Sequence, residues 1–141
     1  MKEPRRTVLV VDDDPDIVEV VSFLLGLHAV PVVVARDGVE ALERLRESND
    51  VGLVLLDLMM PRMNGADVLR AVRRDPALAR TPIVVMSGNR DAAATATEHG
   101  ADDCLLKPVE LDDLTRTVAR YVPLREAVAA SGLSSGDIMR T

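Results

Sequence analysis

The fold is indicated first by residues 8–15, which read VLVVDDDP. Four aliphatic residues lead directly into three aspartates. So short and so apolar a run is typical of a strand that is buried on both faces of a parallel sheet. Asp14 followed by Pro15 is typical of a helix start, because Asp caps free backbone N–H groups and Pro fits the first turn. Residues 8–15 therefore predict a strand, a group of carboxylates at its end and the beginning of a helix.

Three further runs of the chain share this arrangement of an apolar strand that ends at a reactive side chain. They are Leu53–Leu56 before Asp57, Ile83–Met86 before Ser87 and Cys104–Leu106 before Lys107. Parallel strands point the same way, so the residues that follow them gather at one edge of the sheet. That edge is where open α/β sheets bind ligands. We therefore expect one site built from Asp12, Asp13, Asp57, Ser87 and Lys107.

Helix-length segments separate the apolar runs and give the chain a repeating strand–helix pattern. A short strand is predicted over residues 32–35, and helices are predicted over residues 15–27, 37–48, 66–74, 90–99 and 110–121. Right-handed crossovers between such units predict an α/β fold, a flavodoxin-like (βα)5 doubly wound parallel sheet with strand order 2-1-3-4-5. We expect a single domain over residues 7–121, an N-terminal tail over residues 1–6, and a tail or helix extension over residues 122–141.

The composition excludes several classes of protein. Of 141 residues, 48% are hydrophobic and 28% charged, and the net charge of −6 disfavours a nucleic-acid partner, which needs clustered cations. The arginines within residues 70–80, Arg73 among them, are interrupted by acidic residues and are expected to form a solvated helix face. The sequence has no apolar run long enough for a membrane span and no signal peptide, and its single Cys104 cannot form an internal disulfide. We therefore expect a cytoplasmic protein without a membrane partner.

Three aspartates at one sheet edge need a compensating charge. Two carboxylates about 5 Å apart repel by roughly 3 kcal/mol at an effective dielectric constant near 20. A bound cation or raised pKa values relieve this repulsion. Oxygen ligands without His or Cys favour a hard ion, here Mg²⁺, with Mn²⁺ as a substitute. The backbone carbonyl of Met59, just after Asp57, can supply a further ligand.

The residues expected at this edge are also suited to phosphoryl transfer. A carboxylate beside a cation can attack phosphorus and form an aspartyl phosphate. Lys107 offers a positive charge to the incoming phosphoryl oxygens, and Ser87 offers a hydroxyl that can donate a hydrogen bond to one of them. The pattern therefore predicts phosphoryl transfer to an aspartate.

Four motifs of the chain, taken together, closely resemble the receiver domain of two-component response regulators. The resemblance covers about residues 7–121 and rests on residues 8–15 (VLVVDDDP), 55–65 (LLDLMMPRMNG), 85–88 (VMSG) and 100–108 (GADDCLLKP). It implies that Asp57 is the phosphoacceptor for a histidine kinase or a His-containing phosphotransfer protein. Further implied roles are Mg²⁺ binding by Asp12, Asp13 and the carbonyl of Met59, a switch hydroxyl at Ser87, phosphoryl pairing by Lys107, and a cis peptide bond at Lys107-Pro108.

The same resemblance implies a signalling role rather than an enzymatic one. The chain would be a phosphoacceptor that assists its own Mg²⁺-dependent phosphorylation and dephosphorylation. Because the sequence carries no segment of an output domain after the receiver, we expect a single-domain regulator or phosphorelay protein. Its output would then come through contact with a downstream protein, and we expect a monomer or a weak dimer.

Two features depart from the family pattern or add to it. Most receivers carry Tyr or Phe where this chain has Cys104, and that aromatic side chain moves together with the switch hydroxyl. We hypothesise that phosphoryl transfer proceeds here while the conformational output is weak or reorganised.

Phe23 and Leu27 lie four residues apart on a flank of the first helix that should face solvent. They either contact a partner protein or are covered by the chain after Pro123.

Two other functions fit part of the pattern. One is a receiver fold that acts only as a binding module, without phosphorylation. The other is a phosphatase of the haloacid dehalogenase type, which also uses aspartates after its first strand. In that class a later acidic pair follows the lysine, whereas here Asp102-Asp103 precedes Lys107, and Asp57 would have no role.

Overall fold

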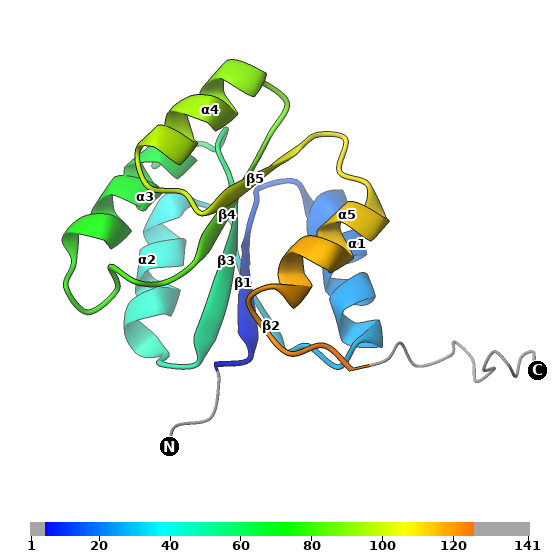
Figure 1. Ribbon diagram of the computed structural model, residues 1–141. Coiled ribbons are helices and arrows are strands. Elements are labelled where there is room, and N and C mark those ends of the chain that lie inside the picture. The colour runs from blue at the N-terminus through cyan, green and yellow to red at the C-terminus, as the bar shows by residue number, and fades with distance from the viewer. Residues whose placement is uncertain (1–4, 126–141) are drawn as a thin grey trace, which may run out of the picture.

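The computed structural model describes residues 5–125 and shows one parallel sheet across them (Figure 1). The strands are β1 (Thr7–Val11), β2 (Val32–Ala35), β3 (Val51–Asp57), β4 (Ile83–Ser87) and β5 (Asp103–Leu106). Their order in the sheet is β2-β1-β3-β4-β5, and every neighbouring pair is parallel. The predicted flavodoxin-like topology is therefore confirmed.

Helices cover both faces of this sheet. They are α1 (Pro15–Leu27), α2 (Gly38–Glu47), α3 (Gly65–Arg74), α4 (Arg90–Glu98) and α5 (Leu111–Ala119). Figure 1 shows α1 and α5 on one face and α2, α3 and α4 on the other. The helix start predicted at Asp14-Pro15 is confirmed, because the Asp14 side chain accepts the N–H of Asp16 and Pro15 opens α1.

The core consists of two layers of aliphatic side chains, one on each face of the sheet. Along β1, Val8 and Val10 join the layer under α1 and α5, whereas Leu9 and Val11 join the layer under α2 and α3. All four side chains are fully buried. A strand buried on both faces needs an unbroken run of apolar residues. Residues 8–11 form such a run, and the sequence therefore predicts that they form an inner strand of the sheet.

The segment after α5 returns to the end of α1. Val122 is buried, Leu124 packs against the α1–α5 layer, and the N–H of Arg125 donates to the carbonyl of His28 over 2.9 Å. In return the carbonyl of Arg125 lies 2.8 Å from Nδ1 of His28. Residues 122–125 therefore do not extend the helix, and the rest of the expected tail, residues 126–141, lies outside the described residues.

Arg73 corrects one expectation drawn from the sequence. Its side chain is only 21% exposed and does not belong to a solvated face. It donates to the carbonyls of Gly100 (3.0 Å), Ala79 (3.1 Å) and Thr81 (2.7 Å), and to the carboxylate of Asp102 (2.9 Å). Arg73 thus joins the end of α3 to the segment before β4 and to the segment between α4 and β5.

Replacing Arg73 with alanine should destabilise the fold by about 2 kcal/mol, because the Asp102 carboxylate and three carbonyls lose a charged donor. Arg70→Ala on the same helix is the matched control. Among residues 5–125, Arg70 pairs only with Asp67 at the surface, and such pairs contribute less than about 1 kcal/mol. Urea unfolding of the two variants measures the difference. Equal losses for both would show that the Arg73 contacts do not stabilise the fold.

Candidate functional site

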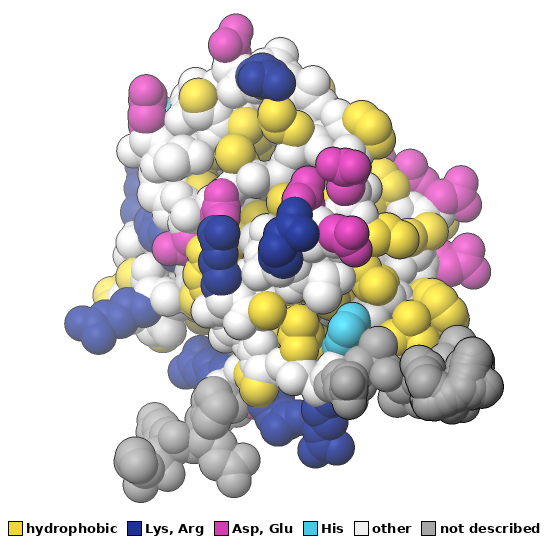
Figure 2. Space-filling model, turned by 45° about the vertical axis from the view of Figure 1, so that its right-hand side comes forward, with side chains coloured by type: hydrophobic (Ala, Val, Ile, Leu, Met, Phe, Trp, Pro, Cys, Tyr) yellow, Lys and Arg dark blue, Asp and Glu magenta, His cyan; other side chains and the backbone are white. Residues whose placement is uncertain are grey.

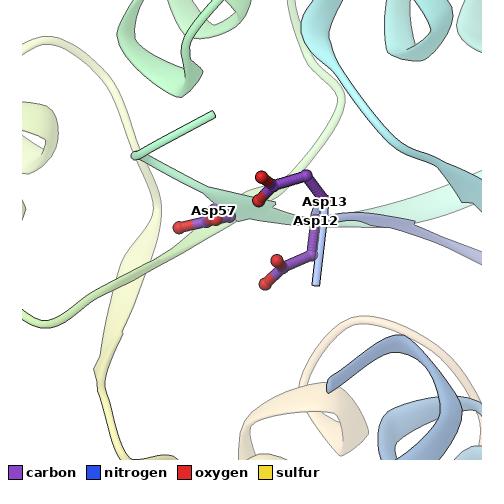
Figure 3. A group of neighbouring side chains, drawn as sticks. All are labelled: Asp12, Asp13 and Asp57. Carbon is purple, nitrogen blue, oxygen red and sulfur yellow. The ribbon is translucent and has the colours of Figure 1, made fainter. Parts of the chain in front are cut away.

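The aspartates predicted to converge do so at the carboxyl ends of β1 and β3. The register places Val11 opposite Leu56, so Asp12 follows β1 directly beside the end of β3 at Asp57. One carboxylate oxygen from each of Asp12, Asp13 and Asp57 lies within 4.8 Å of the others. Figure 3 shows the three side chains grouped at this edge of the sheet. Neighbouring strands that end together therefore build the site, as the strand pattern predicted.

The three carboxylates differ in their exposure to solvent. Asp12 is 1% exposed and Asp57 is 3% exposed, whereas Asp13 is open to solvent. Asp12 also accepts the backbone N–H of Asp14 over 2.9 Å, which orients its carboxylate. Two carboxylates of the site are therefore buried, and the third is exposed at its entrance.

Lys107 supplies the positive charge of the site. Its Nζ lies 3.3 Å from Oδ2 of Asp12 and 3.3 Å from Oδ1 of Asp57. Partial burial of this ammonium group lowers its pKa, but the two carboxylates outweigh that effect and hold the pKa of Lys107 above its usual value. Lys107 is therefore protonated at neutral pH and ready to pair with an anion. The peptide bond Lys107-Pro108 is cis, as the resemblance implied.

Asp57 is held in a less favourable electrostatic environment than an exposed aspartate. Burial, followed by the charge of Asp12, raises the pKa of its carboxyl group. The N–H of Met59 and the Lys107 ammonium act in the opposite direction but do not cancel the effect. A ligand that adds positive charge would stabilise the ionised carboxylate of Asp57.

The loop after β3 wraps closely around Asp57. The N–H of Met59 donates to Oδ1 of Asp57 over 3.2 Å, while the Met59 side chain is 74% exposed. Gly65 at the start of α3 was not singled out in the sequence as part of the site. A Cβ atom there would lie 2.5 Å from the carbonyl oxygen of Asp57. The only signal in the sequence was the Asn64-Gly65 pair, which indicated a turn and not a close approach.

Ser87 ends β4, the strand next to β3, and is buried. Its Oγ accepts the N–H of Asn89 over 3.0 Å and lies 3.2 Å from the carbonyl of Asn89. Its carbonyl accepts the N–H of Lys107 over 2.9 Å, which links the two residues. At Gly88 an added Cβ would meet nothing within 4 Å, so the space beside Ser87 is open.

The residues at this edge fit a divalent cation. All three candidate ligand groups are carboxylates, which hard cations prefer. Three aspartates face a single lysine, so two negative charges remain uncompensated near a site that is largely buried. Asp12, Asp13 and Asp57 would hold the ion, with the Met59 carbonyl as a further oxygen donor.

The remaining residues singled out in the sequence lie away from this site. Cys104 is half-buried on β5 and packs against the layer under α2, α3 and α4. On α1, Phe23 is 67% exposed and Val20 is 49% exposed, whereas Leu27 is half-buried. Figure 2, which turns the α1 and α5 side forward, shows hydrophobic side chains gathered on the right of the view. Phe23 thus faces solvent as the helix periodicity predicted, and Leu27 does so only in part.

Comparison with known sequences gives a consistent result. A family model described as the response regulator receiver domain matches residues 8–119. The chain is 38% identical over 140 residues to the DNA-binding response regulator MtrA of Mycolicibacterium smegmatis. This match covers 98% of this chain and 60% of MtrA. It is 40% identical over 103 residues to the transcriptional regulatory protein CpxR of Escherichia coli. That match covers 72% of this chain and 42% of CpxR. The chain spans about 60% of the length of the MtrA proteins that it matches.

Comparison with solved structures agrees. A response regulator receiver protein from Pseudomonas putida superposes with a TM-score of 0.77 at 30% identity, over 84% of this chain and 99% of that one. The chemotaxis response regulator CheY4 of Vibrio cholerae gives a TM-score of 0.76 at 29% identity, over 83% and 98%. Within residues 5–125, no helix combines the length and the apolar character needed to cross a bilayer.

Proposed function

The chain belongs to the response regulator receiver domain family, and on this premise we propose that it accepts a phosphoryl group on Asp57 in a Mg²⁺-dependent reaction. The donor would be a histidine kinase or a His-containing phosphotransfer protein. The observation that carries this proposal is the geometry of one lysine. Its ammonium group lies 3.3 Å from both buried carboxylates, so a phosphoryl group on Asp57 would lie beside a positive charge.

Each residue of the site has a defined part in this reaction. An Oδ atom of Asp57 attacks phosphorus, the bond from phosphorus to the donor breaks, and its electron pair leaves with the donor. Lys107 pairs with the phosphoryl oxygens, and the hydroxyl of Ser87 can donate to one of them. The Met59 N–H keeps the Asp57 carboxylate oriented. When bound by Asp12, Asp13 and Asp57, Mg²⁺ would supply positive charge for the phosphoryl oxygens.

The contacts favour this acceptor role over the two alternatives. A phosphatase of the haloacid dehalogenase type needs a second acidic pair at the site, but Asp102 binds Arg73 and Asp103 binds Arg120. A binding module that works without phosphorylation would not need two buried acids beside a partly buried lysine. The cost of burying charge is large unless the charges are paired or bind an ion.

Incubation with acetyl phosphate and Mg²⁺, followed by intact-mass measurement, tests the proposal. We expect the mass to rise by one phosphoryl group, with Asp57→Asn unchanged in the same reaction. A phosphatase would instead release phosphate continuously without a stable mass increase. A binding module would do neither, and either result would contradict the acceptor role.

The exposed apolar flank of α1 is our proposed contact for the phosphodonor protein. Val20 and Phe23 lie on it, and an apolar groove of about 280 Å³ between α1 and α5 is lined by Val20 and also by Lys107. A donor that reaches Asp57 must cover the edge of the sheet into which this groove opens. In the rival explanation, the chain after Pro123 covers Phe23 and Leu27 with Leu124, Val128 and Leu133. Leu124 packs against the α1–α5 layer, and the other two covering residues lie outside the described residues.

Phe23→Ala should weaken transfer from a phosphorylated donor protein while leaving phosphorylation by acetyl phosphate unchanged. An aromatic anchor of an interface contributes about 2 kcal/mol, so the KM for the donor protein should rise roughly thirtyfold. Val39→Ala is the matched control, because Val39 is also exposed but lies on α2, across the sheet. An unchanged KM for Phe23→Ala would exclude this contact.

We propose that output passes through protein contact from the β5 side, in the cytoplasm, from a monomer or weak dimer. Cys104 carries no aromatic ring that could change position, and it lines a hollow of about 730 Å³ that is formed mainly by β5, α5 and the segment between them. This supports the hypothesis that phosphorylation here gives a weak or reorganised conformational output. A large coordinated shift of residues 90–104 on phosphorylation would contradict it.

MtrA is described as DNA-binding, so the absence of a nucleic-acid partner stays a prediction for this chain.

A further inference from the structure

The loop that carries Met59 is attached to a part of the fold outside the site. We call residues 58–64, between β3 and α3, the acceptor loop. Its far end lies against the start of α2, where the N–H of Gly38 donates to the carbonyl of Met63 over 3.1 Å. A Cβ atom on Gly38 would lie 2.5 Å from that carbonyl oxygen. The two backbones are therefore in direct contact, with no room for a side chain between them.

An ion pair reinforces this contact. Nε of Arg62 donates to Oδ2 of Asp37 over 3.0 Å, and Nη2 of Arg62 donates to the same oxygen. The Asp37 side chain is only 14% exposed, and its other oxygen caps α2 by accepting the N–H of Glu40 over 2.9 Å. The Glu40 N–H, together with the guanidinium of Arg62, holds the pKa of Asp37 below its usual value. Asp37 is thus a charged group fixed on the scaffold.

The backbone of Arg62 gives a second, independent indication. Its φ is +63°, in the left-handed region that is unfavourable for a residue with a Cβ atom. The backbone alone therefore favours glycine at this position. The side chain found there instead is the one that pairs with Asp37. An unfavourable conformation persists where surrounding contacts hold it, and such positions gather at functional sites.

The near end of the acceptor loop forms part of the phosphoacceptor site. The Met59 N–H donates to Oδ1 of Asp57 over 3.2 Å. The two ends of the loop meet where the N–H of Gly65 donates to the carbonyl of Leu58 over 3.2 Å. We propose that Asp37 and Arg62 are positioning residues, which hold the far end of the acceptor loop on α2 and so fix the Met59 backbone at Asp57. The inference rests on the proposed function, because the reaction that benefits is the phosphorylation of Asp57.

Three variants separate positioning from general stabilisation. Arg62→Gly removes the ion pair but suits the left-handed backbone, so its thermal stability should equal or exceed that of the unmodified chain. Asp37→Asn removes the charge and keeps a good helix cap. Arg62→Lys retains a positive charge and should recover part of the effect. Arg36→Ala, an exposed arginine next to Asp37, is the matched control for loss of charge.

Two measurements on the full chain then test the proposal. In Arg62→Gly, without Mg²⁺ or phosphodonor, hydrogen exchange at the Met59 and Gly65 amides should be about tenfold faster. Its phosphorylation by acetyl phosphate and Mg²⁺ should be about tenfold slower, the usual effect of losing a group that orients a ligand. Arg36→Ala should change neither quantity. If either quantity stays within about twofold of the unmodified chain in Arg62→Gly, the proposal is overturned.

The same variants separate failure of this inference from failure of the proposed function. If the unmodified chain takes up no phosphoryl group, the acceptor role is wrong, whatever the variants do. The exchange rates of the loop amides still decide whether the Asp37–Arg62 pair fixes the loop, because they are measured without phosphodonor. Unchanged exchange would overturn the positioning role in that case as well.

Discussion

Replacing Lys107 with methionine should slow phosphorylation of Asp57 about a hundredfold, because the incoming phosphoryl oxygens lose the charged group that stabilises them in the transition state. Methionine keeps most of the side-chain length and removes only the charge. The Nζ atom lies 3.3 Å from each of two buried carboxylates, and among the described residues no other Lys, Arg or His pairs with either of them. The rate of mass increase with acetyl phosphate and Mg²⁺ measures the effect.

The same variant should bind Mg²⁺ more tightly than the unmodified chain. The ammonium of Lys107 neutralises part of the negative charge of Asp12 and Asp57, and its removal leaves that charge for the ion. Slower phosphorylation together with tighter Mg²⁺ binding, measured by calorimetry, distinguishes a lost catalytic charge from a damaged site. Arg90→Ala, which removes an exposed cation near the same edge of the sheet, should change neither quantity. An unaltered rate in the methionine variant would contradict the role of Lys107 in the reaction.

Gly65→Ala should destabilise the fold by about 2 kcal/mol and slow phosphorylation, because the added methyl group forces the backbone to move. Its Cβ would lie 2.5 Å from the carbonyl oxygen of Asp57 and 2.7 Å from Cα of Leu58, and neither atom can turn away. The strand end that carries the phosphoacceptor must therefore shift.

Gly26→Ala is the matched control for this substitution. Gly26 lies in the last turn of α1, and a Cβ atom there meets nothing within 4 Å. Alanine suits a helix better than glycine, by up to about 1 kcal/mol in the interior, so this variant should be more stable. Opposite signs for the two substitutions, measured by urea unfolding, are the expected result. A neutral Gly65→Ala would show that the loop after β3 is looser than the structure indicates.

The fold and the main site follow from the sequence for a simple physical reason. A parallel sheet buried on both faces requires unbroken aliphatic strands, and these are visible as residues 8–11 and 53–56. Because neighbouring strands end at one edge, the residues that follow them must meet. The positions of Asp12, Asp57 and Lys107 therefore needed no information beyond strand order.

Contacts made by long side chains could not be predicted in the same way. Arg73 is one of several arginines within residues 70–80, and its partner Asp102 lies 29 residues further on. Arg62 meets Asp37, 25 residues earlier, only because the acceptor loop folds back onto α2. Neither pairing leaves a periodic signal in the sequence. The close approach of Gly65 to Asp57 could not be predicted either. A glycine needed for a turn and a glycine needed for close backbone packing cannot be distinguished in the sequence.

Chemical trapping of the phosphorylated residue tests the central claim most directly. The chain is incubated with acetyl phosphate and Mg²⁺, reduced with borohydride, digested and sequenced by mass spectrometry. Borohydride converts an aspartyl phosphate to homoserine, which marks the acceptor permanently. We predict that the mark lies at Asp57 alone and is lost when Mg²⁺ is removed by chelation. A mark at Asp12 or Asp13, or none at all, would contradict the assignment of Asp57 as the phosphoacceptor.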